Sequence, residues 1–277
     1  MIQEKKEVLW RVIPLQDYDI HALHALEDAL LYTVERGMSP PTIIFARVSE
    51  PSISIACHQN INDVNRELCS CLGIPLARRK TGGRGMFLTP EHLIVNVIGK
   101  PEHMDVRFRD IPCLYAWLYA KITQALQEIL GVLTTTDQNH SNIIVNNQKI
   151  GGLSQLQTQG VMLVHGYVRY AKARPLETQC IRFNNHELIT YFEYFSDSAT
   201  SVQEHQQSLG FFDFYDKFAT HVLKELKYTY GSLNESDQNE ARKRQEQHRR
   251  EEWIIGTPDL PSKGHCDQTS IKFSLEP

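Results

Sequence analysis

The sequence contains no long apolar run, no excess of positive charge and no paired cysteine motif of the kind that binds zinc. No stretch approaches the roughly 20 apolar residues that a membrane-spanning helix needs. Its 29 Lys and Arg residues are outnumbered by 33 Asp and Glu residues, which gives a net charge of −4 over 277 residues. We therefore expect no membrane span, no binding of nucleic acid through a basic surface, and no resident metal held by cysteines.

Recognisable targeting signals are also missing. The first ten residues lack both the apolar core of a signal peptide and the Arg-rich, acid-poor character of a transit peptide. The scattered cysteines are Cys57, Cys69, Cys71, Cys113, Cys180 and Cys266. The pattern predicts a cytoplasmic protein in which most thiols, those of Cys57 and Cys113 above all, are small buried groups in a reducing environment.

Strands and helices alternate along the chain without a regular β-α-β rhythm, which favours an α+β fold with a mixed sheet. Apolar periodicity predicts helices at 20–36, 114–129 and 212–226. The runs 42–48 and 52–56 are rich in β-branched residues and are separated by a Glu-Pro turn signal, so we expect them to pair as strands.

A hairpin is predicted where Asn146-Asn147 separates two short runs of β type. The composition changes after Tyr230, because Glu235 to Glu252 is dense in charged and amide side chains and has almost no apolar ones. We therefore expect a main domain over 1–230, followed over 231–277 by a charged helix or linker and a loosely ordered tail.

The segment from Arg78 to Gly85, Arg-Arg-Lys-Thr-Gly-Gly-Arg-Gly, is the most informative for chemistry. Two adjacent glycines allow backbone N–H groups to converge on an anion, and arginine adds planar donors suited to carboxylate or phosphate. Because its four cations repel one another, an anionic ligand among them would relieve that repulsion. A basic surface turn explains the composition equally well.

Two further segments carry candidate residues. Lys149 follows the predicted turn and precedes Gly151 and Gly152, so its ammonium could neutralise a phosphate or polarise an acyl carbonyl. Taken alone, such a lysine is more often a solvated hairpin residue. His165 and Gly166 interrupt an apolar run, and a histidine there is more often a hydrogen-bonded core residue than a catalytic one.

In combination these segments resemble the biotin/lipoate protein ligase family, specifically its lipoate-handling branches. The motifs stand in the family's order and are Ala25-Leu-Glu-Asp28, Ser54-Ile-Ala-Cys-His-Gln-Asn60, Arg78-Arg-Lys-Thr-Gly-Gly-Arg84, Lys149-Ile-Gly-Gly-Leu-Ser-Gln155, Val164-His-Gly166, Ala199-Thr-Ser-Val202 and Trp253-Ile-Ile-Gly-Thr-Pro258. The resemblance implies a class II synthetase-like catalytic domain over 1–230, with a mixed sheet flanked by helices and a small C-terminal extension. It also implies an acyl tunnel beneath the Gly-Gly loop.

The resemblance further implies a lipoate–protein ligase. Such an enzyme would use ATP with Mg²⁺ to activate lipoate or octanoate as an acyl-adenylate. It would then transfer the acyl group to a lysine of a lipoyl carrier domain or a glycine-cleavage H-type protein. Lys149 would be the catalytic residue, spanning the acyl carbonyl and the α-phosphate. The substrate-binding residues implied by the resemblance are Arg78, Arg79, Thr81, Gly82, Gly83, Arg84, Gly151, Gly152, His165 and Gly166.

Some positions depart from the ligase pattern. Leu88-Thr89 stands where ligases usually read His-Asp, and Ser141-Asn142 where they often read Asn-Asp. The Thr-Gly-Gly-Arg loop is more like that of the octanoyltransferase branch, which needs a cysteine nucleophile. In one branch that the chain resembles, this cysteine precedes the lysine hairpin, and the stretch from Thr134 to Asn142 contains none. In another branch it follows the His-Gly strand, and that resemblance implies Cys180 as the possible nucleophile. Two alternatives therefore stay open: an octanoyl- or lipoyltransferase acting from a carrier thioester, and a non-catalytic module that binds acyl groups or carrier domains.

Overall fold

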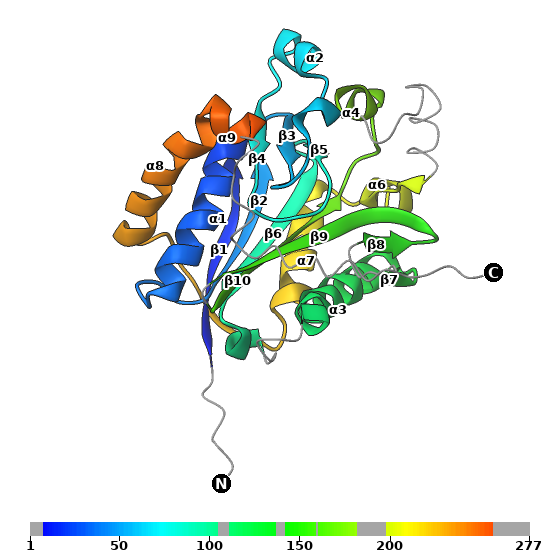
Figure 1. Cartoon of the computed structure of the whole chain (residues 1–277). Coiled ribbons are helices and arrows are strands. Elements are labelled where there is room, and N and C mark those ends of the chain that lie inside the picture. Colours follow the sequence, from blue (N-terminus) through cyan, green and yellow to red (C-terminus); the bar gives the residue numbers. More distant parts are fainter. Residues whose placement is uncertain (1–7, 105–110, 137–141, 159, 182–197, 257–277) are drawn as a thin grey trace, which may run out of the picture.

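A mixed sheet of eight strands runs through the centre of the computed structural model, which describes residues 8–104, 111–136, 142–158, 160–181 and 198–256 (Figure 1). Its strands, in spatial order, are β11 (Lys227–Tyr230), β1 (Leu9–Tyr18), β2 (Thr42–Val48), β6 (His92–Gly99), β10 (Val161–Arg169), β9 (Gln148–Thr158), β8 (Asn142–Val145) and β7 (Thr134–Thr136). β1 is parallel to both of its neighbours, and the remaining pairs are antiparallel. The predicted α+β fold with a mixed sheet flanked by helices is confirmed.

A second sheet of three strands holds the Gly-Gly segment. It has the order β4 (Leu76–Arg78), β3 (Ser52–Ile55) and β5 (Met86–Leu88). The predicted pairing of 42–48 with 52–56 is wrong, because β2 bonds to β1 and β6 while β3 bonds to β4 and β5. The Glu-Pro signal therefore marks a passage between two sheets rather than a hairpin. As a result, the Gly-Gly loop crosses from β4 to β5 over the end of β3.

Helices cover both faces of the large sheet (Figure 1). α1 (Ile20–Glu35) and α8 (Glu235–Arg249) lie on one face, and α3 (Ile111–Leu130) and α7 (Phe211–Leu223) lie on the other. α1, α3 and α7 confirm the three predicted helices. The short helices are η1 (Ile61–Asp63), α2 (Arg66–Cys71), η2 (Pro101–Met104), α4 (Pro175–Cys180), α6 (Val202–His205) and α9 (Glu251–Ile255).

β6 is buried on both of its faces, as expected of a central strand covered by two helical layers. Val95 and Val97 pack in the core beneath α3 and α7. Ile94 and Ile98 pack in the core beneath α1. Because side chains alternate along a strand, each helical layer receives every second residue. In the described part of the chain, no helix is long and apolar enough to cross a bilayer.

The hairpin between β8 and β9 forms where it was predicted. Asn146 and Asn147 have φ values of 47° and 65°, the left-handed conformation that a two-residue hairpin turn requires. Asparagine tolerates this conformation better than most residues do. The turn places Lys149 at the start of β9, beside the chain at Ala199.

The charged segment after Tyr230 is largely helical and packs against α1. Asp237 of α8 is fully buried and accepts hydrogen bonds from Arg11 at 2.7 Å, Thr33 at 2.7 Å and Ser39 at 2.5 Å. A helix with few apolar residues thus docks through buried polar contacts. The boundary predicted near Tyr230 stays a prediction, and Ser141 and the tail 257–277 lie outside the described residues.

Candidate active site

The Gly-Gly loop and the lysine hairpin, far apart in the sequence, line one cavity of about 920 Å³. Gly83 and Arg84 contribute from the loop, and Lys149 contributes from the start of β9. Apolar side chains form much of the remaining wall, among them Leu23, Met86, Phe87, Leu88, Ile94, Leu153 and Ile181. The cavity therefore combines a cationic group with an apolar interior.

Arg79 holds the Gly-Gly loop from within. Its guanidinium is buried and donates to the carbonyl oxygens of Gly82 at 2.7 Å, Arg84 at 2.8 Å and Ser54 at 3.0 Å. It also donates to the Thr81 hydroxyl at 3.0 Å. Burial lowers the pKa of Arg79 to about 10, against the opposing effect of the Glu27 carboxylate. The role implied for Arg79, contact with the acid end of a ligand, stays a prediction, because these donors already shape the loop.

Arg78 points away from the cavity and joins two other segments. Its guanidinium donates to the carbonyl oxygens of Ala56 at 2.7 Å and Gln59 at 2.9 Å, just after β3. It also donates to the carbonyl oxygens of Ile254 and Ile255 in α9, both at 3.0 Å. Arg78 is therefore a structural link between α9 and the loop after β3.

The repulsion expected among the cations of this segment is relieved inside the protein. Besides the contacts of Arg78 and Arg79, Lys80 forms an ion pair of 2.7 Å with Asp28 of α1. The same carboxylate accepts from the buried His248 of α8 at 3.0 Å. Cation repulsion alone is thus no argument for an anionic ligand here.

A buried polar network lies beneath the Gly-Gly loop. Glu27 of α1 accepts from His24 at 3.0 Å and from His165 of β10 at 2.8 Å. The second nitrogen of His165 hydrogen bonds with the Thr81 hydroxyl at 2.8 Å, and that of His24 with the Ser54 hydroxyl at 2.9 Å. Burial alone would raise the pKa of Glu27, but charge interactions and hydrogen bonds with the two histidines lower it below its usual range. Glu27 is thus ionised.

His165 is both a hydrogen-bonded core residue and part of the cavity wall. Two glycines beside it are required by packing. A Cβ atom on Gly151 would lie 2.2 Å from the Tyr167 carbonyl oxygen, and one on Gly166 would lie 2.9 Å from Leu153. Gly151 and Gly166 therefore allow β9 and β10 to approach closely, and Gly166, unlike Gly151, also lines the cavity together with Gly152.

Glycine at position 83 meets a conformational need as well as a packing one. Gly83 has a φ of 91°, in the left-handed region, and a Cβ atom there would lie 3.1 Å from the Arg79 guanidinium. The preceding carbonyl, that of Gly82, also accepts from the Ser154 hydroxyl of β9 at 2.9 Å. The loop is thus fixed from two sides.

Lys149 is held by its backbone and directs its side chain towards the cavity. Its carbonyl oxygen accepts from the Thr200 N–H at 2.9 Å, and its Nζ lies 5.9 Å from the centre of the Tyr167 ring. Among the described residues, no carboxylate forms an ion pair with Lys149. Its charge is therefore available to a ligand within the cavity.

The cysteines differ sharply in their surroundings. Cys180 is fully buried beside Cys69, and burial raises the pKa of both thiols, that of Cys69 to about 12. A protonated thiol in a core is a poor nucleophile, which argues against the role suggested for Cys180. Cys57, which was expected to be buried, is partly exposed, and its Sγ lies 3.4 Å from Nδ1 of His58.

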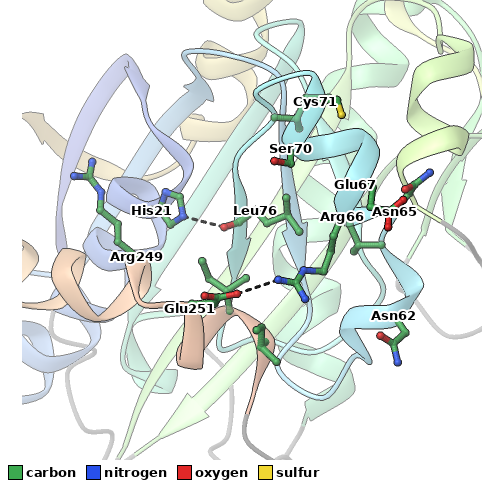
Figure 2. Close-up of a pocket in the computed structure, with 14 residues that line it drawn as sticks. His21, Asn62, Asn65, Arg66, Glu67, Ser70, Cys71, Leu76, Arg249 and Glu251 are labelled. Carbon is green, nitrogen blue, oxygen red and sulfur yellow. Dashed lines mark hydrogen bonds and ion pairs between the residues drawn. The ribbon is translucent and has the colours of Figure 1, made fainter.

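A second hollow, of about 1030 Å³, lies between α2 and α9 (Figure 2). Arg66 and Glu251 form an ion pair of 3.0 Å at this hollow, and His21 hydrogen bonds with the Leu76 carbonyl oxygen at 2.9 Å. None of the substrate-binding or catalytic residues implied by the resemblance lines it. We therefore assign the candidate active site to the cavity that contains Lys149.

One known protein family matches most of this chain. The model of the lipoyl protein ligase A/B catalytic domain matches residues 19–224, and the chain belongs to this family. Octanoyltransferase LipM of Halalkalibacterium halodurans is 28% identical over 185 residues, which cover 57% of this chain and 65% of that protein, slightly less than two thirds of its length. Octanoyltransferase LipM of Exiguobacterium sibiricum is 24% identical over 274 residues, covering 88% of this chain and 97% of that protein.

Solved structures agree with the fold. Lipoate-protein ligase A bound with ATP superposes with a TM-score of 0.78 at 17% identity, covering 90% of this chain and 99% of that one. A putative lipoate protein ligase from Thermoplasma acidophilum with bound lipoic acid gives a TM-score of 0.76 at 17% identity, covering 90% and 100%. At this level of identity the likeness concerns the fold alone.

The relatives correct the predicted reaction. Those from H. halodurans, Clostridioides difficile, E. sibiricum and Bacillus subtilis are all named octanoyltransferases, so the prediction of an ATP-dependent lipoate–protein ligase is wrong. The prediction of ATP and Mg²⁺ as a substrate pair is wrong with it. The motifs behind that prediction mark the shared fold of the family, whereas the Thr-Gly-Gly-Arg form of the loop was the signal that pointed to the transferase branch.

Proposed function

We propose that this chain is an octanoyltransferase of the cytoplasm. It takes an octanoyl group from the thioester of a carrier protein and transfers it to a lysine of a lipoyl carrier domain or a glycine-cleavage H-type protein. The observation that carries the proposal is the shared cavity, in which the Lys149 ammonium and the Gly-Gly loop meet an apolar interior. The names of the relatives support the choice of a thioester donor.

The cavity suits the two parts of an octanoyl thioester. Its apolar wall can take the hydrocarbon chain, with a gain of about 0.8 kcal/mol for each methylene group removed from water. The reacting carbonyl develops negative charge on its oxygen when a nucleophile attacks, and a fixed ammonium near that oxygen stabilises the charge. We assign this role to Lys149. Because a thioester is already activated, the reaction requires no ATP.

The acceptor amine must lose a proton before it attacks. A free lysine has a pKa of about 10.4, and a nearby positive charge lowers the pKa of a second amine. The Lys149 ammonium would act in this direction on an acceptor lysine that enters the cavity. The same residue therefore assists both the donor and the acceptor.

The proposal is tested by presenting two donors to the purified protein with an apo lipoyl domain. One reaction contains an octanoyl carrier thioester without ATP, and the other contains lipoate with Mg-ATP. We expect the lipoyl domain to gain the mass of one octanoyl group in the first reaction only. If the lipoyl domain gains no mass with either donor, the proposed transferase activity is contradicted, and the result favours a protein that only binds acyl groups.

Two single-residue variants test whether the transfer activity depends on the cavity that contains Lys149. Lys149→Ala should lower the transfer rate by about 100-fold or more, since a fixed charge on a developing oxyanion contributes that much. Lys243→Ala is the matched control, because Lys243 is exposed on α8 and its ion pair among the described residues is with Glu240 of the same helix. Equal rates for the two variants would contradict the assignment of Lys149.

A further inference from the structure

We propose that Cys57 accepts the octanoyl group as a thioester and that the imidazole of His58 takes its proton. The inference rests on the proposed function and names the nucleophile of the same site. Transfer from a thioester to an amine is commonly divided into two steps by a cysteine nucleophile. Cys57 directly precedes the cavity-lining residue His58, although Cys57 is not itself among the lining residues.

The thiol and its base are adjacent and lie at the Gly-Gly loop. The Cys57 Sγ is 3.4 Å from His58 Nδ1. The His58 side chain lines the cavity together with Gly83 and Lys149. A Cβ atom added to Gly82 would lie 3.6 Å from Cε1 of His58, so the imidazole rests directly against the Gly-Gly turn.

The backbone of Cys57 is fixed on both sides. Its N–H donates to the Thr81 carbonyl oxygen at 3.1 Å, and its own carbonyl oxygen accepts from Arg78 at 3.2 Å. The same Arg78 guanidinium holds the carbonyls of Ala56 and Gln59 on either side. Because its backbone is already fixed, Cys57 loses little conformational entropy when the donor binds.

Two positively charged side chains lie near Cys57. The guanidinium groups of Arg78 and Arg79 are both close enough to interact favourably with a negative charge on Cys57. Reactive cysteines are typically found in partly exposed, electropositive surroundings of this kind. The cavity is a separate observation that points to a ligand, because it joins the Lys149 ammonium to an apolar wall.

The other described thiols are less suitable. Cys69 and Cys180 are buried together in the core beneath α2 and α4. Cys71 is exposed, but it lies on α2 at the second hollow, away from the cavity that contains Lys149 (Figure 2). The side chains of Cys113 and Cys266 lie outside the described residues, so the experiment below includes them.

Both steps balance without a further reactant. In the first, His58 removes the Cys57 proton, the sulfur attacks the thioester carbonyl, and the carrier thiolate leaves and takes the proton. In the second, the neutral amine of the acceptor lysine attacks the Cys57 thioester, the amide bond forms, and the Cys57 sulfur leaves. The proton released by the amine returns to Cys57 through His58.

The test is to isolate the acyl-enzyme. The wild-type protein is mixed with octanoyl carrier thioester without the acceptor domain, quenched in acid and measured as an intact mass. Peptide mapping then locates the octanoyl group among all six cysteines, and its removal by neutral hydroxylamine identifies a thioester. We expect one octanoyl group on Cys57. Cys57→Ala should form no adduct and lose transfer by at least about 1,000-fold, the range found when a nucleophile is removed.

His58→Gln should keep the adduct site but slow its formation by about 100-fold, the usual contribution of a general base. Cys71→Ala is the matched control and should form the adduct at the wild-type rate. Thermal melting of each variant confirms that it is folded.

Two failures are distinguishable. If the wild-type protein transfers octanoate but the adduct maps to another cysteine, or if Cys57→Ala keeps full transfer, the assignment of Cys57 is overturned and the proposed function stands. If the wild-type protein neither transfers octanoate nor forms an adduct from the thioester, the proposed function itself is overturned.

Discussion

The two faces of the large sheet are built on different principles. The face beneath α3 and α7 is packed with aliphatic and aromatic side chains such as Val97, Leu126 and Phe218. The face beneath α1 begins in the same way but carries a buried carboxylate, Glu27, bonded to two histidines where the sheet meets the Gly-Gly loop. One face therefore supplies stability, and the other gives up some apolar packing to hold charged groups in fixed positions.

The largest expected effect comes from breaking the apolar face. Phe218→Ala removes a fully buried ring from α7 and should lower the free energy of unfolding by about 3–5 kcal/mol. Phe212→Ala is the matched control on the same helix, where the ring is 61% exposed, and should cost about 1 kcal/mol or less. Urea unfolding measures both, and similar losses would show that the α7 face does not form the core described here.

A smaller loss is expected from the charged face. Glu27→Gln keeps the shape of the side chain but removes the negative charge that His24 and His165 share, and should cost about 1.5–3 kcal/mol, the range for hydrogen bonds to a charged group. Transfer activity should fall with it, because His165 and Thr81 lose their fixed positions. Glu246→Gln, at an exposed position on α8, is the control. A stable Glu27→Gln protein with full activity would contradict a role for the network in the site.

The charged face should also make stability depend on pH. The pKa of Glu27 is lowered in the folded protein, so its contribution is complete above the unfolded value of about 4.3 and is lost as the pH falls below it. Burial lowers the pKa of His24, so the unfolded chain binds more protons as the pH falls below about 6.5. Both effects have the same sign, and urea unfolding at a series of pH values should show stability falling from neutrality towards pH 4. Glu27→Gln should flatten the acid part of this curve.

The smallest effect is expected where the loop meets β9. Ser154→Ala removes one hydrogen bond to the Gly82 carbonyl, which keeps its bond from Arg79, and should cost about 1 kcal/mol. The consequence for transfer should be a change of a few-fold in the apparent affinity for the thioester. A loss of activity as large as that of Lys149→Ala would show that the loop depends on Ser154 more than on Arg79.

The sequence predicts the elements that depend on local signals. Apolar periodicity locates α1, α3 and α7, and Asn146-Asn147 locates the hairpin that presents Lys149, since each of these depends on a few neighbouring residues. The same reasoning fails for β2 and β3, which look like a pair but join different sheets. Strand partners are chosen by long-range contacts that a local pattern does not contain.

The candidate site is predicted only in part. The Gly-Gly loop and Lys149 were identified from their motifs, and the structure brings them to one cavity. The ligand-binding roles of Arg78 and Arg79 stay predictions, and the carbonyl oxygens that accept hydrogen bonds from them include long-range partners that the motif does not reveal. Cys57 was assigned to the core because cysteine is usually buried. Its place beside His58 at the cavity depends on how β3 ends, which composition does not reveal.

The link made by Arg78 has a consequence for how the protein is synthesised. Arg78 precedes two of its acceptors, the carbonyls of Ile254 and Ile255, by about 176 positions in the chain. While a ribosome is still making the chain, the guanidinium must stay hydrated or find provisional partners until α9 has emerged. The segment that holds Cys57 and His58 should therefore acquire its final shape only after α9 has emerged.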